Sequence, residues 1–393
     1  MGEGINMKIL LTSDIYLPSV NGVVTSIRIL YKELKKRGND VKILTLSPNG
    51  QEYISEDVYY LKSFDLKLYP GIKGSLSFKS SFLQELISWE PDVIHSHTEF
   101  ITMHYANKIS KLLKIPHFHT YHTMYEDYVG YIMKEMNLSK KAAALASKFA
   151  VRHVDKIIAP TVKVENALKS YGVKQPISVI PTGIDLQKFN LEFTQYEKTQ
   201  FKKQLGIKEN EKILLYLGRI GKEKNIEEIM ENFSLSSEDK KLLIVGGGPY
   251  LDNLKIKVKE LSLENKVIFT GMIAPQQVVK YYKISDVFLT ASISETQGLT
   301  YLEALASGTP VICRKDDSNE GLIKDNFNGF RYDNTDSYLK ALDKVLKENG
   351  KFRQNAIKSI FNYSKDIYGE RVNKLYEIGF NQVRYQAPIV SHM

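Results

Sequence analysis

The chain has 393 residues, of which 43% are hydrophobic, 11% aromatic and 25% charged. This composition excludes a disordered tail protein, a collagen and a simple coiled coil, and the length predicts two or three domains. The single cysteine, Cys313, excludes an internal disulfide and a zinc site made of several cysteines. A net charge of +9, from 54 Lys and Arg against 45 Asp and Glu, favours an anionic partner: nucleic acid, an acidic membrane surface or a phosphorylated substrate.

The sequence does not predict a membrane-spanning segment. No apolar run approaches the roughly 20 residues that cross a bilayer. The first apolar run, at 8–12, has the size of a strand and is broken at once by Ser13 and Asp14, so it does not resemble a signal peptide. We therefore expect a cytoplasmic protein, held peripherally on the inner face of the cell membrane if it contacts a membrane.

Strand-like and helix-like segments alternate through the first half of the chain. The run 8–12 predicts a strand. Residues 23–38 predict a helix, because apolar residues recur at helical spacing, basic residues fill the last turn and a glycine follows. Further buried strands are predicted at 41–46, 92–97, 117–122 and 156–161. Apolar strands that alternate with helices indicate a parallel sheet covered on both faces.

The pattern restarts in the second half, where strands are predicted at 212–220, 240–248, 266–271, 286–292 and 309–314. We therefore expect an α/β fold of two doubly wound domains, 1–190 and 191–363, that face each other across a cleft. A predicted helix at about 364–382 either caps the second half or crosses back to the first. In such sheets ligands bind beyond the carboxyl ends of the strands.

Two loops after predicted strands offer sites for a phosphate. In 13–23, Gly22 lies at a helix start, where backbone N–H groups favour an anion and glycine permits close approach. An ordinary turn glycine would give the same pattern, and the G-x-G-x-x-G spacing of a dinucleotide site is absent. Arg219 and Lys224 follow the strand at 212–220 and suit a diphosphate, although a solvated basic loop is an equal interpretation.

The strongest pattern is a pair of glutamates eight residues apart, Glu295 and Glu303, with Gly298 between them. If a helix begins near Leu299, Glu303 lies in its first turns, Glu295 stays in the preceding loop, and both face the cleft. Paired carboxylates accept hydrogen bonds from sugar and ribose hydroxyls, and the N–H groups from Gly298 to Thr300 would point at an anion. Two surface glutamates near a helix start would give the same pattern.

Histidines and carboxylates gather in 117–128, where His119 and His122 follow a predicted strand. This mixture of residues can bind zinc. The spacing is neither H-E-x-x-H nor a Cys/His set, so we expect no metal site. A satisfied buried histidine is a reasonable interpretation of His95 and His119.

These pieces occur in a fixed order over nearly the whole chain, about 8–380. A glycine loop after the first strand, T-Y-H-T, G-R-x(4)-K, G-G-G-P, F-T-G, and E-x(7)-E followed by A-S-G-T-P-V resemble the retaining glycosyltransferases of family four. The E-x(7)-E and G-R-x(4)-K segments carry most of the specificity, because the glycine loops are weak individually. The resemblance implies the GT-B fold, with two facing Rossmann-like domains.

The resemblance also implies residue roles. The implied catalytic residues are Arg219, Lys224, His122 and Glu295. The implied donor-binding residues are Gly22, Arg219, Lys224, Met272, Ile273, Glu295, Gly298, Leu299, Thr300 and Glu303. The two cations would bind the diphosphate of a nucleotide-sugar, Glu303 the ribose and Glu295 the donor sugar. His122 would contact the sugar's 6-hydroxyl, Gly22 would approach the β-phosphate, and the backbone around Met272 would read the base, most often uracil.

The family's chemistry is glycosyl transfer with retention, in which the leaving phosphate accepts the acceptor's proton on the front face. No carboxylate nucleophile emerges from the sequence. The resemblance implies no cofactor and no required metal, because the cations stabilise the charge that grows on the β-phosphate. The UDP-sugar would be a co-substrate.

One departure narrows the resemblance. Many family members have Phe before the glycine of the E-x(7)-E segment, whereas Gln297 stands here. This variant, with Y-H-T-x-Y-E-D-Y at 121–128 and G-V-V-T-S-I at 22–27, resembles the bacterial glycosyldiacylglycerol synthases. These transfer glucose or galactose from a UDP-sugar to diacylglycerol or glucosyldiacylglycerol.

The alternative functions are a GT-B enzyme with a soluble or cell-wall polymer acceptor and a UDP-sugar epimerase. No nucleic-acid motif appears, so we expect no nucleic-acid partner.

A lipid acceptor would require contact with an anionic membrane surface. Residues 62–79 carry four Lys and one Asp, and 132–156 carry six basic against two acidic residues, both interleaved with apolar residues. Each basic group near an anionic leaflet contributes about 1 kcal/mol. Basic amphipathic helices also commonly pack on their own core. The candidate acceptor or membrane residues are Tyr125, Asp127, Lys67, Lys73, Lys140 and Lys141.

Overall fold

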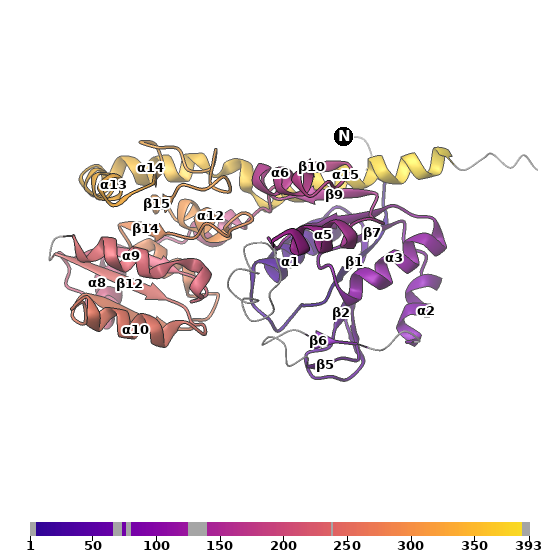
Figure 1. Ribbon diagram of the computed structural model, residues 1–393, viewed down its shortest axis with the longest axis horizontal. Coiled ribbons are helices and arrows are strands. Elements are labelled where there is room, and N and C mark those ends of the chain that lie inside the picture. The colour runs from indigo at the N-terminus through magenta and orange to yellow at the C-terminus, as the bar shows by residue number, and fades with distance from the viewer. Residues whose placement is uncertain (1–4, 66–72, 76–79, 125–139, 237–238, 387–393) are drawn as a thin grey trace, which may run out of the picture. The chain divides into compact units, whose positions relative to one another are not determined.

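The computed structural model describes residues 5–65, 73–75, 80–124, 140–236 and 239–386. The chain divides into two compact units (Figure 1). Among the described residues, the first unit takes the chain up to 183 together with 365–386, and the second unit takes 184–364. The first junction therefore lies a few residues before the boundary at 190/191 that the sequence suggests.

The first unit is built on an eight-stranded sheet in the order β10-β9-β8-β7-β1-β2-β4-β3. All neighbouring strands are parallel except β3 and β4, which are antiparallel. The strands are β1 (Lys8–Ser13), β2 (Asp40–Leu46), β3 (Tyr53–Ser55), β4 (Val58–Leu61), β7 (Val93–Ser96), β8 (His117–Thr120), β9 (Lys156–Ala159) and β10 (Ile177–Val179). A separate antiparallel pair is formed by β5 (Phe64–Asp65) and β6 (Lys73–Gly74).

Helices cover both faces of this sheet. The helices are α1 (Gly22–Lys36), α2 (Ser81–Ser88), α3 (Ile101–Leu113), α5 (Lys140–Ala150), α6 (Val162–Ser170) and α15 (Lys365–Gln386). Successive strand residues point to opposite faces. Ile9 and Leu11 of β1 accordingly share an apolar cluster with α1 and α15, whereas Leu10 lies in a cluster with α2 and α3.

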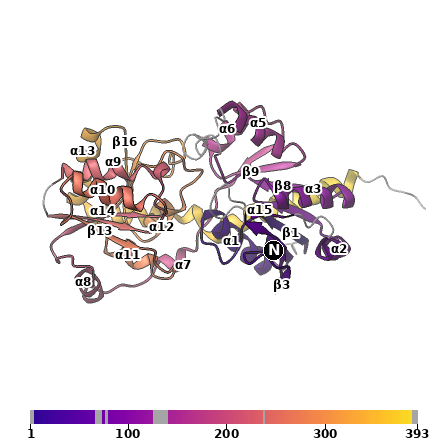
Figure 2. The same cartoon turned by 60° about the horizontal axis from the view of Figure 1, so that its bottom comes forward.

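The C-terminal helix α15 packs against α1 (Figure 2). The Nζ of Lys36 lies 2.7 Å from a carboxylate oxygen of Asp366. The hydroxyls of Ser26 and Tyr368 lie 3.2 Å apart in the buried interior. The sequence left open which half this helix joins, and in the structure it is part of the first unit.

The second unit is built on a six-stranded parallel sheet in the order β13-β12-β11-β14-β15-β16. The strands are β11 (Lys212–Leu217), β12 (Lys240–Val245), β13 (Val267–Gly271), β14 (Val287–Thr290), β15 (Val311–Arg314) and β16 (Gly329–Tyr332). Numbered from β11, this is the 3-2-1-4-5-6 order of doubly wound nucleotide-binding sheets. The order reverses between β11 and β14, and in such folds the ligand binds beyond the strand ends at that point.

Both faces of the second sheet are also covered. The helices are α7 (Leu186–Phe189), α8 (Gln195–Gln204), α9 (Ile226–Ser234), α10 (Leu251–Glu260), α11 (Val278–Ile284), α12 (Leu299–Ala306), α13 (Thr335–Lys347) and α14 (Asn349–Ser359), with the short 3-10 helices η2 (Lys222–Lys224) and η3 (Phe361–Tyr363). Leu215 of β11 lies in one apolar cluster with α11 and α12, and Leu214 lies in the other with α9 and α10.

The prediction of two parallel α/β sheets is confirmed, and each apolar run that predicts a strand forms one. The sequence predicted neither the short pair β5 and β6 nor four short strands of the two large sheets, β3, β4, β10 and β16. Three of them are the outermost strands of their sheets, and β4 is next to an outermost strand. The outermost strands β3 and β10 have no buried residue and β16 is buried only at its two ends, so these three lack the continuous apolar run that marks a central parallel strand, whereas β4 is mostly buried.

Candidate active site

Arg219 and Lys224 follow β11, at the point where the strand order of the second sheet reverses. The hydroxyl of Tyr216 donates a hydrogen bond to the backbone carbonyl oxygen of Arg219, 2.8 Å away. The Arg219 guanidinium is ion-paired with Glu223, whose side chain is buried. The turn of η2 places Lys224 so that its Nζ lies 2.6 Å from Oε1 of Glu295.

The Lys224–Glu295 pair connects the loop after β11 with the loop after β14. These are the two strands that flank the reversal point of the sheet. Two cations and two carboxylates therefore alternate over this edge, which is the position where an α/β sheet binds its ligand. Sequence spacing predicted the two cations and Glu295 here but gave no indication that Glu223 pairs with Arg219.

The three glycines at 246–248 allow two backbone segments to approach closely. A Cβ atom on Gly246 would lie 2.0 Å from the carbonyl oxygen of Gly218, and one on Gly248 would lie 2.2 Å from that of Ile220. The Ile220 N–H donates to the Gly247 carbonyl at 2.9 Å. The glycines thus let the loop after β12 support the loop that carries Arg219.

The helix start predicted after Gly298 is present, since α12 begins at Leu299. Gly298 has a φ of 72°, and a Cβ atom there would lie 2.7 Å from the ring of Tyr301. Glycine is therefore required here for two reasons: the backbone is left-handed, and the Tyr301 ring leaves no space for a Cβ atom. The N–H groups of Leu299 and Thr300 belong to the first turn of this helix, as a site for phosphate or sugar oxygens requires.

Glu303 lies within α12 and is held by a neighbouring tyrosine. The Tyr282 hydroxyl donates to Oε2 of Glu303 at 3.2 Å. Burial raises the pKa of the Glu303 carboxyl to about 7. A carboxylate that is half-buried and already oriented can accept hydrogen bonds from a pair of hydroxyls at fixed positions.

Met272 and Ile273 follow β13 at the same carboxyl edge of the sheet. Met272 is 76% exposed. A Cβ atom on Gly247 would lie 2.9 Å from its side chain, so Met272 lies beside the glycine loop. Ile273 is partly buried against the core of the unit. The residues predicted to bind the donor in the second unit therefore all lie on or next to this sheet edge.

Gly22 and His122 belong to the first unit. Gly22 is the first residue of α1, and the side chain of Asn21 caps this helix by accepting from the Val24 N–H. His122 follows β8, and its Nε2 lies 3.0 Å from Nδ1 of His97, which follows β7. The structure thus places His97, which the sequence did not single out, next to the predicted His122.

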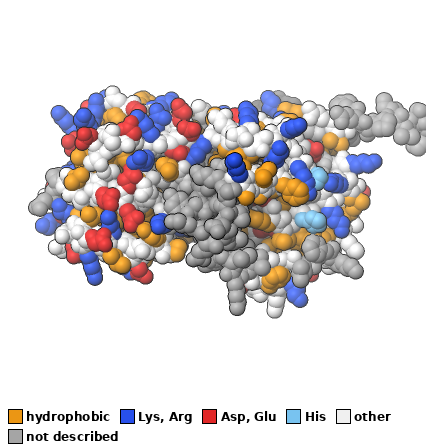
Figure 3. Space-filling model, viewed as in Figure 1, with side chains coloured by type: hydrophobic (Ala, Val, Ile, Leu, Met, Phe, Trp, Pro, Cys, Tyr) orange, Lys and Arg blue, Asp and Glu red, His pale blue; other side chains and the backbone are white. Residues whose placement is uncertain are grey.

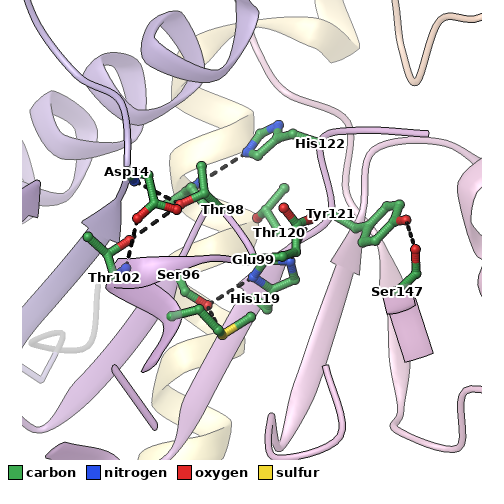
Figure 4. Close-up of polar contacts among 12 residues, drawn as sticks. Asp14, Ser96, Thr98, Glu99, Thr102, His119, Thr120, Tyr121, His122 and Ser147 are labelled. Atoms are coloured by element: carbon green, nitrogen blue, oxygen red, sulfur yellow. Dashed lines mark hydrogen bonds and ion pairs between the residues drawn. The ribbon is translucent and has the colours of Figure 1, made fainter. Parts of the chain in front are cut away.

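The carboxyl edge of the first sheet is rich in buried polar side chains (Figure 4). Oδ1 of Asp14, after β1, accepts from the Thr102 N–H at 2.8 Å and so caps the start of α3. The Asp14 N–H donates to the Thr98 hydroxyl oxygen at 2.8 Å. The Ser96 hydroxyl lies 2.9 Å from Nδ1 of His119. Burial raises the pKa of Asp14.

Four histidines of this region, His95, His97, His117 and His119, are fully or almost fully buried. Burial lowers the pKa of His95, His97 and His117. Within the described residues, no group of three or more His, Cys, Asp and Glu side chains is arranged to hold a metal ion.

The predicted acceptor or membrane residues lie mostly outside the described part of the chain. Lys67, Tyr125 and Asp127 are not among the described residues, and Lys140 is described only by its place at the start of α5. Lys73 pairs with Asp65 at 2.8 Å, and its side chain is 18% exposed. Lys141 is exposed on α5.

Two family profiles cover most of the chain. Residues 20–188 match the family described as Glycosyltransferase Family 4, and residues 197–362 match that described as Glycosyl transferases group 1. The alpha-monoglucosyldiacylglycerol synthase of Streptococcus pneumoniae is 39% identical to this chain, over 94% of the chain and 85% of the relative. This chain belongs to glycosyltransferase family 4. It is therefore a glycosyltransferase, as the motifs predicted.

A second relative is the alpha-monoglucosyldiacylglycerol synthase of Acholeplasma laidlawii, which is 30% identical to this chain, over 94% of the chain and 96% of the relative. Among solved structures, sucrose-phosphate synthase of Thermosynechococcus elongatus matches with a TM-score of 0.75 and 20% identity, over 96% of this chain and 100% of that chain. HepE of Anabaena in complex with UDP and glucose matches with a TM-score of 0.72 and 16% identity, over 95% and 100%. The glycosyltransferase has the GT-B fold.

Proposed function

We propose that this glycosyltransferase transfers a hexose, with retention, from a UDP-sugar to diacylglycerol or glucosyldiacylglycerol in membrane glycolipid synthesis. The observation that carries the proposal is the 39% identity to the pneumococcal synthase over 94% of this chain. Both relatives named above are alpha-monoglucosyldiacylglycerol synthases, which favours glucose as the sugar and diacylglycerol as the acceptor.

The arrangement of the second unit supports a nucleotide-sugar donor. Arg219 pairs with Glu223, and Lys224 pairs with Glu295, at the reversal point of the sheet. The Arg219 guanidinium can bind a diphosphate through two N–H groups, and the Lys224 ammonium can bind it as a compact positive charge. The half-buried carboxyl of Glu303 would accept hydrogen bonds from the ribose hydroxyls. A solved structure with the same fold, HepE, is in complex with UDP and glucose, which agrees with a UDP donor.

The proposed chemistry needs stabilisation of a leaving diphosphate. As the bond from the sugar C1 to the β-phosphate oxygen breaks, negative charge grows on that phosphate. Arg219, Lys224 and the first-turn N–H groups of α12 would stabilise this charge more strongly than they stabilise the intact donor. The leaving phosphate would accept the proton of the attacking hydroxyl, and Glu295, released from Lys224, would accept hydrogen bonds from the donor sugar.

The exposed face of α5 and the residues that follow it support a peripheral membrane contact. Leu145 and Phe149 are 65% and 63% exposed. Three basic residues, Lys141, Lys148 and Arg152, lie on the same exposed stripe at spacings of three or four residues. Figure 3 shows hydrophobic and basic side chains next to one another over this helix. Within the described residues, no helix is both long enough and apolar enough to cross a bilayer.

The stripe on α5 fits the surface of an anionic leaflet. Apolar side chains at the centre can enter the interface between headgroups and acyl chains, while basic side chains contact lipid phosphates. Each basic group near such a surface contributes about 1 kcal/mol. A cytoplasmic enzyme held in this way would reach an acceptor that stays in the membrane.

A product assay tests the proposed function. The purified protein is given UDP-glucose or UDP-galactose with vesicles that contain diacylglycerol or glucosyldiacylglycerol, and the product lipid is identified by mass spectrometry and its anomeric configuration by NMR. We expect an α-glucosyl lipid from UDP-glucose and diacylglycerol. Sugar transfer only to water-soluble acceptors, or conversion of the UDP-sugar without an acceptor, would overturn the proposal.

Matched arginine variants show whether the product comes from this site. Arg219→Ala should reduce turnover by about 100- to 1,000-fold, because a donor that stabilises charge in the transition state is lost. Arg371→Ala removes an exposed arginine of α15 and should leave turnover unchanged. Equal activities for both variants would contradict the role given to Arg219.

A further inference from the structure

Three histidine rings form a column at the carboxyl edge of the first sheet. His95 lies in β7, His97 follows β7, and His122 follows β8. The ring centroids of His95 and His97 are 4.1 Å apart, and those of His97 and His122 are 5.3 Å apart with nearly parallel planes. His97 is thus the middle member, buried between a core histidine and the partly exposed His122.

Hydrogen bonds to the ring of His95 and to the backbone of His97 fix the position of this column. The ring nitrogens of His95 lie within hydrogen-bond distance of the hydroxyls of Tyr376 and Thr120, the latter at 2.7 Å. The His97 N–H donates to the Thr12 carbonyl oxygen at 2.8 Å, so the backbone of His97 is attached to β1. The order of the first sheet reverses between β1 and β7, which makes the His97 position the switch point of this unit.

A single proton lies between His97 and His122. Their Nδ1 and Nε2 atoms are 3.0 Å apart. Burial and the neighbouring histidines lower the pKa of both rings, so both are neutral near pH 7. In a hydrogen bond between two neutral imidazoles one nitrogen donates and the other accepts, and the choice fixes the tautomer of both rings.

The other ring nitrogen of His97 decides which way this bond runs. Nε2 of His97 is buried and has no hydrogen-bond partner among the described residues. If His122 donated to His97, this Nε2 would carry a buried N–H without an acceptor. If His97 donates, the same atom is an acceptor without a donor, and in proteins buried acceptors are left unpaired somewhat more often than buried N–H groups.

We propose that His97 is a positioning residue that donates its Nδ1–H to Nε2 of His122, so that His122 carries its own proton on Nδ1. His97 would set both the orientation of the His122 ring and the nitrogen that carries the proton. An imidazole N–H can donate to a hydroxyl or phosphate oxygen of a bound substrate. The identity of that substrate rests on the proposed function, whereas the tautomer does not.

Nitrogen NMR tests the tautomer directly. In protein labelled with ¹⁵N-histidine, two-bond ¹H–¹⁵N spectra distinguish protonated from unprotonated ring nitrogens, and the His122 signals are those that disappear in His122→Gln. We expect the Nδ1–H form of His122 in the unmodified protein. His97→Phe keeps an aromatic ring without the donor and should shift His122 toward the Nε2–H form. In His97→Asn the amide N–H can replace Nδ1–H, so the Nδ1–H form should be retained.

The kinetics of the same variants test whether the orientation and tautomer of His122 matter for turnover. His97→Phe should lower kcat by about 10- to 100-fold, the size of effect expected from misplacing a reacting group. The KM for the donor should change little, because Arg219, Lys224 and Glu303, which are assigned to its diphosphate and ribose, all lie in the second unit. His97→Asn should recover most of kcat. His104→Phe makes the same change at an exposed histidine of α3 and should match the unmodified protein.

Two results would overturn the proposal: an Nε2–H tautomer of His122 in the unmodified protein, or a His97→Phe variant with unchanged tautomer and kcat. If His97→Phe is folded poorly, as shown by its melting temperature and UDP affinity, His97→Asn gives the comparison instead: loss of the Nδ1–H form in this variant overturns the proposal. Failure to turn over any UDP-sugar would contradict the proposed function, while the NMR result would still decide the role of His97.

Discussion

At the scale of single residues, each of the two cations of the candidate donor site is paired with a carboxylate. Arg219 pairs with Glu223 and Lys224 with Glu295. Such charge-assisted pairs hold long side chains in one orientation and reduce the mutual repulsion of two cations on one loop. A diphosphate would therefore meet cations that are already oriented, and Glu223 would remain beneath Arg219 as its counter-charge.

The protonation of Glu303 gives a prediction for the affinity of UDP. Its pKa of about 7 means that it ionises as the pH rises through neutrality. The carboxylate accepts hydrogen bonds from two hydroxyls, whereas the protonated acid is a weaker acceptor. Affinity for UDP measured by calorimetry should therefore rise with pH, by up to about tenfold between about pH 6 and pH 8.

Two Glu→Gln variants separate this effect from the ionisation of UDP itself. Glu303→Gln cannot ionise at this position, so only the pH dependence that belongs to UDP should remain. Glu264→Gln makes the same change at an exposed glutamate of the second unit and should retain the full dependence. An identical pH profile for all three proteins would show that Glu303 does not contact the nucleotide.

At the scale of elements, the sequence predicts those strands that have continuous apolar runs and long helices with a clear period. The core strands β1, β2, β11 and β12 are buried on both faces, and burial on both faces requires such runs. For α5, helical spacing alone does not show which side chains pack on the core. The structure shows this, since Ala143 and Ser147 are buried while Leu145 and Phe149 are exposed.

The exposed face of α5 gives a prediction at this scale. The double variant Leu145→Glu/Phe149→Glu places two carboxylates where apolar side chains would enter the interface. Co-sedimentation with anionic vesicles should fall several-fold, since apolar insertion is lost and the new charges repel the lipid. Turnover of a short-chain acceptor dissolved in micelles should fall less, because the donor site is unchanged.

Leu235→Glu is the matched control, because Leu235 is 62% exposed and lies in the second unit, outside α5. It should bind vesicles like the unmodified protein. Equal losses in the control and the double variant would mean that added negative charge, and not the face of α5, controls binding.

At the scale of the whole molecule, the net charge of +9 predicts salt-sensitive membrane binding. The excess of basic over acidic residues is larger in residues 1–190, which have 24 basic and 18 acidic residues. The remainder has 30 basic and 27 acidic residues. Binding of the complete chain to anionic vesicles should weaken steeply as ionic strength rises from about 0.01 M to about 1 M, because the Debye length falls from about 30 Å to about 3 Å. Vesicles of zwitterionic lipid should bind weakly at every salt concentration, and binding that is insensitive to salt would exclude an electrostatic contact.

The sequence by itself determined the family, the two parallel sheets and the order of the motifs. Each of these depends on local patterns: apolar runs, helical periods, and charged residues placed just after strands. Because parallel strands end at a shared edge, the sequence could also predict that Arg219, Lys224 and Glu295 belong to one site.

Only the tertiary structure decided which side chains hold these residues in place. His95 and Tyr376 are 281 residues apart in sequence, and His97 meets His122 only because β7 and β8 are neighbours. The buried pairing of Glu223 with Arg219, and the membership of α15 in the first unit, likewise depend on how elements pack. Periodicity reports which face of an element is buried, whereas the partner that a buried polar group finds is set by the packing of distant segments.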